Sequence, residues 1–191
     1  MIKVETKRHK RLSQGDIYRD VEWFESVTQS EDIITVEKVT FPYVIVLTQE
    51  CDLKFDYEFR WGKLKDKENQ DKYLISVLVA PIYNAEHVYV GEHLSEIGLK
   101  MTSVPKKHSS GDVFRQNKNP RYHYLEFPTK TRMVESVIDF KHYFSVNVEY
   151  LKSIQKSNFV FRVGKLFRED ISHRFASFLC RIGLPEVKEK K

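Results

Sequence analysis

A short apolar run at residues 43–47 (YVIVL) constrains the fold more than any other stretch of the sequence. A continuous apolar run of this length, rich in β-branched residues, is typical of a strand that is buried on both faces. The run ends abruptly in a polar cluster made of Thr48, Gln49, Glu50, Cys51 and Asp52. Because a rigid strand fixes the groups at its end, the sequence predicts a central strand at residues 41–48 and a candidate site directly after it.

Alternation of apolar and polar residues predicts further strands on either side of this run. We expect one strand to start at Ile17, and others to cover residues 33–39, 73–82, 122–127, 132–140 and 158–163. Residues 141–151 continue as a strand-like or turn segment. We also expect a polar loop at residues 28–32, and the end of a strand at Pro81, because proline cannot donate to a sheet ladder.

The clearest helical pattern lies at residues 167–182. Its apolar positions follow the spacing of one buried helix face, at Ile171, Phe175, Phe178, Leu179 and Ile182. We therefore predict a single domain over residues 1–191, with a β-rich body at 12–165 and a C-terminal packing helix at 166–185. The predicted fold class is mainly β (α+β), a β-rich body with a C-terminal amphipathic helix.

Composition limits the classes of partner and cofactor. The net charge of +5 and the pI of about 9.0 fit an anionic partner such as RNA or DNA. The two cysteines form no C-x-x-C pair and the seven histidines lack metal-ligand spacing, so we predict no disulfide framework, no metal and no cofactor. No apolar run approaches the ~18–20 residues that cross a bilayer, and the N-terminus lacks a signal-peptide core. We therefore expect a cytoplasmic protein without a membrane partner.

Three short motifs are similar to the small barrel of the PemK/MazF toxin family. They are Gly15-Asp16-Ile17, the strand at residues 42–48 (PYVIVLT) and the strand at residues 77–82 (VLVAPI). This resemblance covers residues 12–85 and implies that the β-rich, barrel-like body is a small SH3-like/PemK-like β-barrel with added strands. The remainder resembles bacterial proteins without an established activity. The family's catalytic arginine before the proline is Phe41 here, and the threonine or serine after P-I is Tyr83. The resemblance therefore implies a barrel that lacks the family's ribonuclease chemistry.

A second set of residues would suit thiol chemistry. Cys51 and Asp52 follow the central strand, and His123 and His142 lie in later segments, with Asp139 three residues before His142. A thiol nucleophile needs a histidine base and an orienting group, so these residues are candidates for catalysis if the fold brings them together. The alternative is that Cys51 is a small buried residue and Asp52 caps a turn. Glu50, Asp52 and Asp56 at alternating strand positions would instead face one cation, but no further ligand is fixed.

A third set mixes cations with an aromatic side chain, as surfaces that bind nucleic acid do. Its members are Lys106, Lys107, Arg115, Lys118 and Arg121 in the long polar segment 102–121, together with Arg60 and Trp61. A solvated surface loop explains the same residues without a ligand.

The function predicted from these patterns is a non-catalytic β-barrel binding protein. We expect it to act as an accessory of a bacterial toxin–antitoxin or phage-defence system, and to bind RNA, DNA or a partner protein of the same system. The alternative is an enzyme, either a divergent ribonuclease or a thiol-dependent hydrolase centred on Cys51 and Asp52. A third hypothesis is a structural subunit that docks through an exposed strand edge or aromatic face. Homodimerisation is compatible with each of them.

Overall fold

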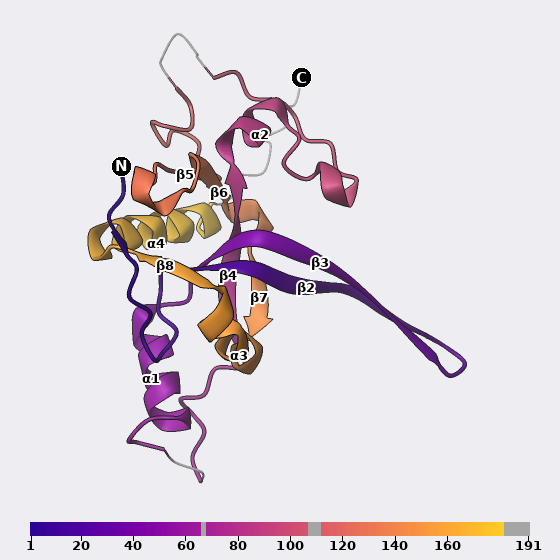
Figure 1. The fold of residues 1–191 in the computed structure, drawn as a ribbon, viewed down its shortest axis with the longest axis vertical. Helices are drawn as coiled ribbons and strands as arrows, with labels where there is room; N and C mark the ends of the chain where they lie inside the picture. The colour runs from indigo at the N-terminus through magenta and orange to yellow at the C-terminus, as the bar shows by residue number, and fades with distance from the viewer. Residues whose placement is uncertain (66–67, 107–111, 182–191) are drawn as a thin grey trace, which may run out of the picture.

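The computed structural model describes residues 1–65, 68–106 and 112–181. Within these residues an antiparallel sheet has the strand order β1-β8-β2-β3-β4-β6-β5, and β7 also pairs with β4. The sheet curls into a half-barrel accompanied by helices (Figure 1), so the predicted α+β class with dominant β structure is confirmed. The strands are β1 Val4–Glu5, β2 Asp16–Ser30, β3 Ile33–Val46, β4 Ser76–Asn84, β5 Tyr122–Leu125, β6 Ser136–Asp139, β7 Phe144–Asn147 and β8 Phe159–Val163. The helices are α1 Glu50–Arg60, α2 Ala85–Val90, α3 Val148–Asn158 and α4 Lys165–Leu179, with short 3₁₀ turns η1 Ser95–Ile97, η2 Thr129–Thr131 and η3 Phe140–His142.

The central strand predicted at residues 41–48 is confirmed as a strand, and its second half is buried. Val44 and Ile45 are fully buried, and Val46 is almost so. The same three residues pair with β4, while β2 lies on the other side of β3. The strands predicted at residues 33–39 and 41–48 are one continuous strand, because Thr40 and Pro42 lie within the extended ladder.

Helix α4 covers one face of the sheet, as predicted. Ile171, Phe175 and Phe178 pack in one cluster with sheet residues such as Ile45 and Phe161. The buried helix face predicted from the sequence included Leu179, which was wrong, because this side chain is 49% exposed at the end of the helix. The predicted position Ile182 lies outside the described residues.

The other face of the sheet is covered by two helices that the sequence patterns did not predict. Leu53 of α1 and Leu151 of α3 join the cluster that contains Val77 and Val146. Helix α3 replaces most of the strand-like segment expected at residues 141–151. Its N-cap is Asn147, whose side chain accepts hydrogen bonds from the backbone N–H groups of the next turn.

Two further expectations about local structure were wrong. Glu50, Asp52 and Asp56 lie on α1, so they do not alternate along a strand and do not face one cation from it. Pro81 does not end β4 but lies inside it, opposite Val44. A proline is tolerated at this position because β4 changes partners there, from β3 and β7 to β6.

The outer half of the β2–β3 hairpin projects from the body of the molecule (Figure 1). Residues 28–32, expected as a polar loop, instead continue both strands to a two-residue turn at Glu31 and Asp32. Strand β8 pairs with β2 only as far as Tyr18, and β4 pairs with β3 only from Val44. We call residues 24–38 the arm; among the described residues, neither of its edges pairs with a further strand.

Candidate functional site

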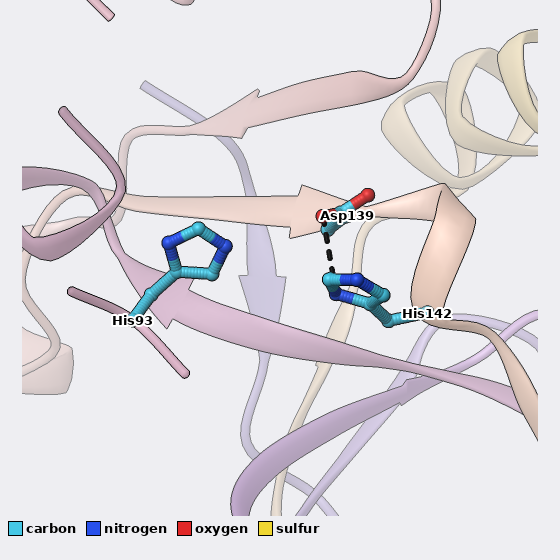
Figure 2. Close-up of side chains that lie close together, drawn as sticks. All are labelled: His93, Asp139 and His142. Atoms are coloured by element: carbon cyan, nitrogen blue, oxygen red, sulfur yellow. Dashed lines mark ion pairs between the residues drawn. The ribbon is translucent and has the colours of Figure 1, made fainter. Parts of the chain in front are cut away.

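The cluster with most chemical potential lies where three separate segments meet. His93 lies in the loop after α2, and this loop begins at Gly91, which ends the helix with a left-handed φ of 79°. Asp139 is the last residue of β6, and His142 is the last residue of the 3₁₀ turn that begins directly after it. Figure 2 shows the two imidazole rings and the carboxylate approaching one another from these segments. One nitrogen of each histidine and one oxygen of Asp139 all lie within 4.8 Å of one another.

Asp139 organises this cluster from a fully buried position. Its Oδ2 lies 3.1 Å from Nδ1 of His142, and its Oδ1 accepts a hydrogen bond of 3.0 Å from the backbone N–H of Lys141. Arg121 grips the same carboxylate with two hydrogen bonds, Nε to Oδ1 at 2.8 Å and Nη2 to Oδ2 at 2.5 Å. Such a bidentate pair fixes the carboxylate in both position and orientation.

Burial disfavours the charged form of both histidines of the cluster. Desolvation lowers the pKa of His93 and of His142, although the nearby carboxylate of Asp139 acts in the opposite direction. Both ring nitrogens of His93 are shielded from solvent and meet no hydrogen-bond partner of normal geometry within the described chain. His142 has a second neighbour in Tyr83, whose hydroxyl lies 3.4 Å from its Nδ1. The backbone of His87 lies close enough to raise the pKa of His93, so the two buried ring nitrogens are only weakly compensated, which is uncommon in folded proteins.

A pocket of about 470 Å³ opens beside the cluster, and His93 and Tyr83 form part of its wall. The rest of the wall is mostly apolar and comes from the base of the β2–β3 hairpin, the segment around η1, and the segment before β6. Each of these three parts places an apolar side chain in the wall: Phe41 from the hairpin, Leu94 from the segment around η1, and Met133 from the segment before β6. The volume falls in the range of small-molecule sites, which are typically apolar with a few polar groups. The cluster therefore borders a space that can receive a ligand.

The thiol arrangement predicted from the sequence is not assembled in this structure. Cys51 is exposed in the first turn of α1, where its Sγ contacts Gln49 Oε1 at 3.6 Å and Asp52 Oδ1 at 3.5 Å. His123 is buried in β5, and no hydrogen bond among the described residues joins Cys51 to His123 or His142. The alternative, a buried Cys51, is also wrong, because α1 turns this side chain to solvent. The predicted proximity of Asp139 and His142 is the part of the arrangement that the structure contains.

The basic residues predicted to bind nucleic acid are mostly engaged with carboxylates. The ion pairs are Lys106–Glu86 at 2.6 Å, Arg115–Glu135 at 2.5 Å, Arg121–Asp139 at 2.5 Å and Arg60–Asp56 at 2.8 Å. Trp61 is 38% exposed, and the guanidinium carbon of Arg60 lies 5.3 Å from the centroid of the Trp61 ring. Lys118 is exposed, and Lys107 lies outside the described residues. These side chains therefore have structural roles in addition to any contact with phosphate.

The sequence analysis missed His93 as a site residue. It lies 46 residues before Asp139 and shares no short motif with it. The sequence offers no specific signal for His93, because a histidine shortly after a helix-ending glycine is not typical of any kind of site. The proximity of the two histidines depends on the antiparallel pairing of β4 with β6, and one sequence does not reveal which strands pair.

Comparison with protein-family models, curated proteins and solved structures finds no match for this chain. What the fold and the cluster define is therefore a class, a β-dominated α+β protein with a curled half-barrel, a projecting hairpin and a histidine–carboxylate pocket. No helix in the described residues is long and apolar enough to cross a membrane. The similarity to the PemK/MazF family stays a prediction.

Proposed function

We propose that this chain is a non-catalytic interaction protein, and that its projecting β2–β3 arm docks onto a second copy of the chain. The observation that carries the proposal is the exposed apolar face of the arm. Val27 lies directly opposite Val36. Ile34 lies two residue pairs closer to the tip, and therefore on the same face. Their exposed fractions are 64%, 47% and 63%, and Phe24 on this face is 58% exposed.

An arm of this kind is poorly suited to remain alone in water. A two-stranded hairpin without a further strand or a packed face is marginally stable. Its open edges also present unpaired backbone groups that invite another chain. The arm contains only strand residues and a tight turn, so its apolar face is ready for an interface without prior refolding. Docking would supply the contacts that the isolated arm lacks.

Charge complementarity favours a second copy as the occupant. The arm contains one cation, Lys38, and four carboxylates, Glu25, Glu31, Asp32 and Glu37. Its formal charge is therefore −3, and the rest of the +5 chain carries +8. An acidic arm is attracted to the basic body of a neighbouring molecule and is repelled by nucleic acid.

The size of the arm favours reciprocal exchange over a simple stack of two arms. One arm face measures roughly 24 Å by 10 Å from ordinary strand dimensions. That is about 240 Å², well below the ~800 Å² per partner of a standard interface. In a two-fold dimer in which each arm lies on the other body, four such surfaces become buried, or about 1,000 Å² in total. This reaches the lower limit of a specific interface.

The experiment is the molar mass in solution, measured by light scattering and sedimentation over a concentration series. The wild type should show a monomer–dimer equilibrium. The triple variant Val27→Thr, Ile34→Thr, Val36→Thr keeps β-forming side chains but removes apolar surface at six places in the symmetric dimer. At roughly 0.5–1 kcal/mol for each place, we expect the dimer to weaken by more than about 100-fold.

The matched control is Ile33→Thr, which changes an equally exposed side chain on the opposite face of the arm. It should dimerise like the wild type. A wild type that is monomeric at every concentration, or a dimer that the triple variant does not weaken, would overturn the proposal. A monomer that instead binds labelled RNA or DNA in a salt-dependent way would restore nucleic acid as the partner.

A wider role in a bacterial toxin–antitoxin or phage-defence system remains part of the proposal. Its support is limited to the PemK-like motifs in residues 12–85 and to the loss of the family's catalytic positions at Phe41 and Tyr83. In the structure, Phe41 stacks on Phe144 with ring centroids 4.9 Å apart, and Tyr83 packs beside His142. Both positions thus have packing roles, which supports binding over ribonuclease chemistry.

A further inference from the structure

We propose that His93, Asp139 and His142 form a binding site for a divalent transition metal of the zinc type, at the inner end of the pocket. The proposal goes beyond the interaction function and does not depend on it. Two imidazoles and one carboxylate are a donor set that suits zinc and its first-row neighbours. Magnesium and calcium instead prefer sites built mostly from oxygen atoms.

The separations between the donor atoms are close to those of a bound metal. Two ligands bonded at about 2.0–2.2 Å in a tetrahedral arrangement lie about 3.3–3.6 Å apart. His142 Nδ1 and Asp139 Oδ2 are 3.1 Å apart, and the widest separation in the cluster is within 4.8 Å. A rotation of the His93 ring on its loop, moving the donor nitrogen by roughly 1 Å, would complete the set.

The state of His93 is a second observation that points to a ligand. Both nitrogens of its ring are buried, and neither forms a hydrogen bond within the usual distance and angle limits in the described chain, although the backbone of His87 lies nearby. A bound ion would give a buried nitrogen the partner that it lacks. The ring leans against Tyr83, with centroids 4.9 Å apart, which holds it near the carboxylate of Asp139.

Arg121 determines how the carboxylate can serve a metal. Its two hydrogen bonds hold Asp139 in place, as partners behind a ligand commonly do. The single proton of a neutral imidazole can reside on either nitrogen, so Nδ1 of His142 can face a metal when the proton is on Nε2. The positive charge of Arg121 opposes that of the metal, so we expect a moderate affinity. Three protein ligands leave a fourth position for water, and of the three ligands His93 also lines the pocket.

The test uses the full chain without a histidine tag, stripped of metal by a chelator. Zinc is titrated in competition with a chromophoric chelator, and Co²⁺ is added separately to record its visible d–d absorption, which reports nitrogen and oxygen ligation. We expect one Zn²⁺ per chain, little competition from Mg²⁺ or Ca²⁺, and a Co²⁺ spectrum typical of four-coordination.

The variants His93→Ala and His142→Ala should each weaken zinc binding by more than about 100-fold, since even partners behind a ligand contribute 10–100-fold. The matched control is His87→Ala, because His87 lines the same pocket but is outside the cluster. It should bind zinc like the wild type. Circular dichroism checks that each variant is folded, and His142→Gln replaces His142→Ala if the latter is not.

The site is overturned if the folded wild type binds no zinc, or if zinc binding survives in both ligand variants. Equal loss in His87→Ala would also overturn it, because binding would then follow the pocket rather than the cluster. The molar mass of each variant is measured in the same series. Failure of the metal site with an intact dimer, or the reverse, separates this proposal from the interaction function.

Discussion

Asp139 shows how one buried carboxylate can set the geometry of its surroundings. It is fully buried, it accepts hydrogen bonds from Arg121 and from the backbone N–H of Lys141, and its Oδ2 lies 3.1 Å from Nδ1 of His142. Removing a carboxylate from water is unfavourable unless its oxygens find donors, and here Arg121 supplies two donors and Lys141 one. These bonds hold the carboxylate at the start of η3, with Oδ2 facing the His142 ring.

Breaking the Arg121–Asp139 pair should destabilise the fold strongly. Arg121→Met leaves the buried carboxylate without its cation, and we expect a loss of about 3 kcal/mol in the free energy of unfolding, measured by urea denaturation. Arg115→Met is the control, because the Arg115–Glu135 pair is solvent-exposed and should contribute much less than the buried pair. Equal losses in the two variants would contradict a special role for the buried pair.

His123 should make the protein sensitive to mild acid. Burial lowers its pKa from 6.5 to about 4. Between these values the unfolded chain binds a proton at this position and the native chain does not, so stability falls as the pH falls below about 6.5. The loss in the free energy of unfolding that His123 causes should reach about 2 kcal/mol at pH 5 and be absent above pH 7.

The measurement compares urea denaturation of the wild type and His123→Phe at pH 7.5 and pH 5. The variant has no imidazole at this position, so its stability should fall less by about 2 kcal/mol between the two pH values. Because both proteins keep His93 and His142, their difference isolates His123. A difference that does not change with pH would show that His123 is protonated as easily in the native state as in the unfolded chain.

At the scale of elements, the loop that carries His93 depends on one glycine. Gly91 ends α2 with a φ of 79°, and a Cβ at this position would lie 2.3 Å from the carbonyl oxygen of Met101. Backbone atoms cannot give way as a flexible side chain can. The packing of segment 101–103 against Gly91 thus fixes the start of the loop that brings His93 to the cluster.

Gly91→Ala should therefore lower the free energy of unfolding by more than about 2 kcal/mol, through the left-handed backbone and the clash together. It should also weaken zinc binding, because His93 is displaced. Gly98→Ala is a close control: φ is 76° there as well, but nothing lies within 4 Å of the added Cβ. That variant should lose only about 1 kcal/mol. Thermal or urea denaturation gives the comparison, and equal effects would rule out the clash.

At the scale of the whole molecule, the charge of the arm and that of the body should couple dimerisation to salt. The arm carries −3 and the remainder +8, and interactions between exposed charges are screened over about 10 Å at 0.1 M salt. We expect the dissociation constant of the dimer to rise several-fold between low and high NaCl, measured by sedimentation.

The variant Glu31→Gln, Asp32→Asn removes two negative charges at the tip of the arm. It should bind less tightly at low salt and show a smaller dependence on salt than the wild type. A dimer that strengthens with salt in both proteins would indicate an interface held by apolar contacts alone. In that case attraction between the acidic arm and the basic body would not select a second copy as the partner, although the apolar face would still be the interface.

Local patterns predicted the parts of the fold in which burial repeats regularly along the chain. The β-branched run before Thr48 could be recognised as a central strand, and the apolar spacing from Ile171 to Phe178 as a packed helix. Helix α3 was missed because the alternation of β7 continues by coincidence through Val148, beyond the cap at Asn147. Helix α1 was missed because only Leu53 and Asp56 of its eleven residues are buried, which leaves hardly any apolar periodicity.

By itself, then, the sequence determined the β-dominated class, the central strand and the covering helix, since these follow from which side chains must avoid water. It also contained the Asp139–His142 pair, three residues apart. Only the tertiary structure decided which distant groups meet: it brought His93 to that pair, turned Cys51 to solvent, and gave the arm no neighbouring strand among the described residues. The physical reason is that contacts between remote segments depend on strand order and register, and hydrophobic periodicity encodes neither.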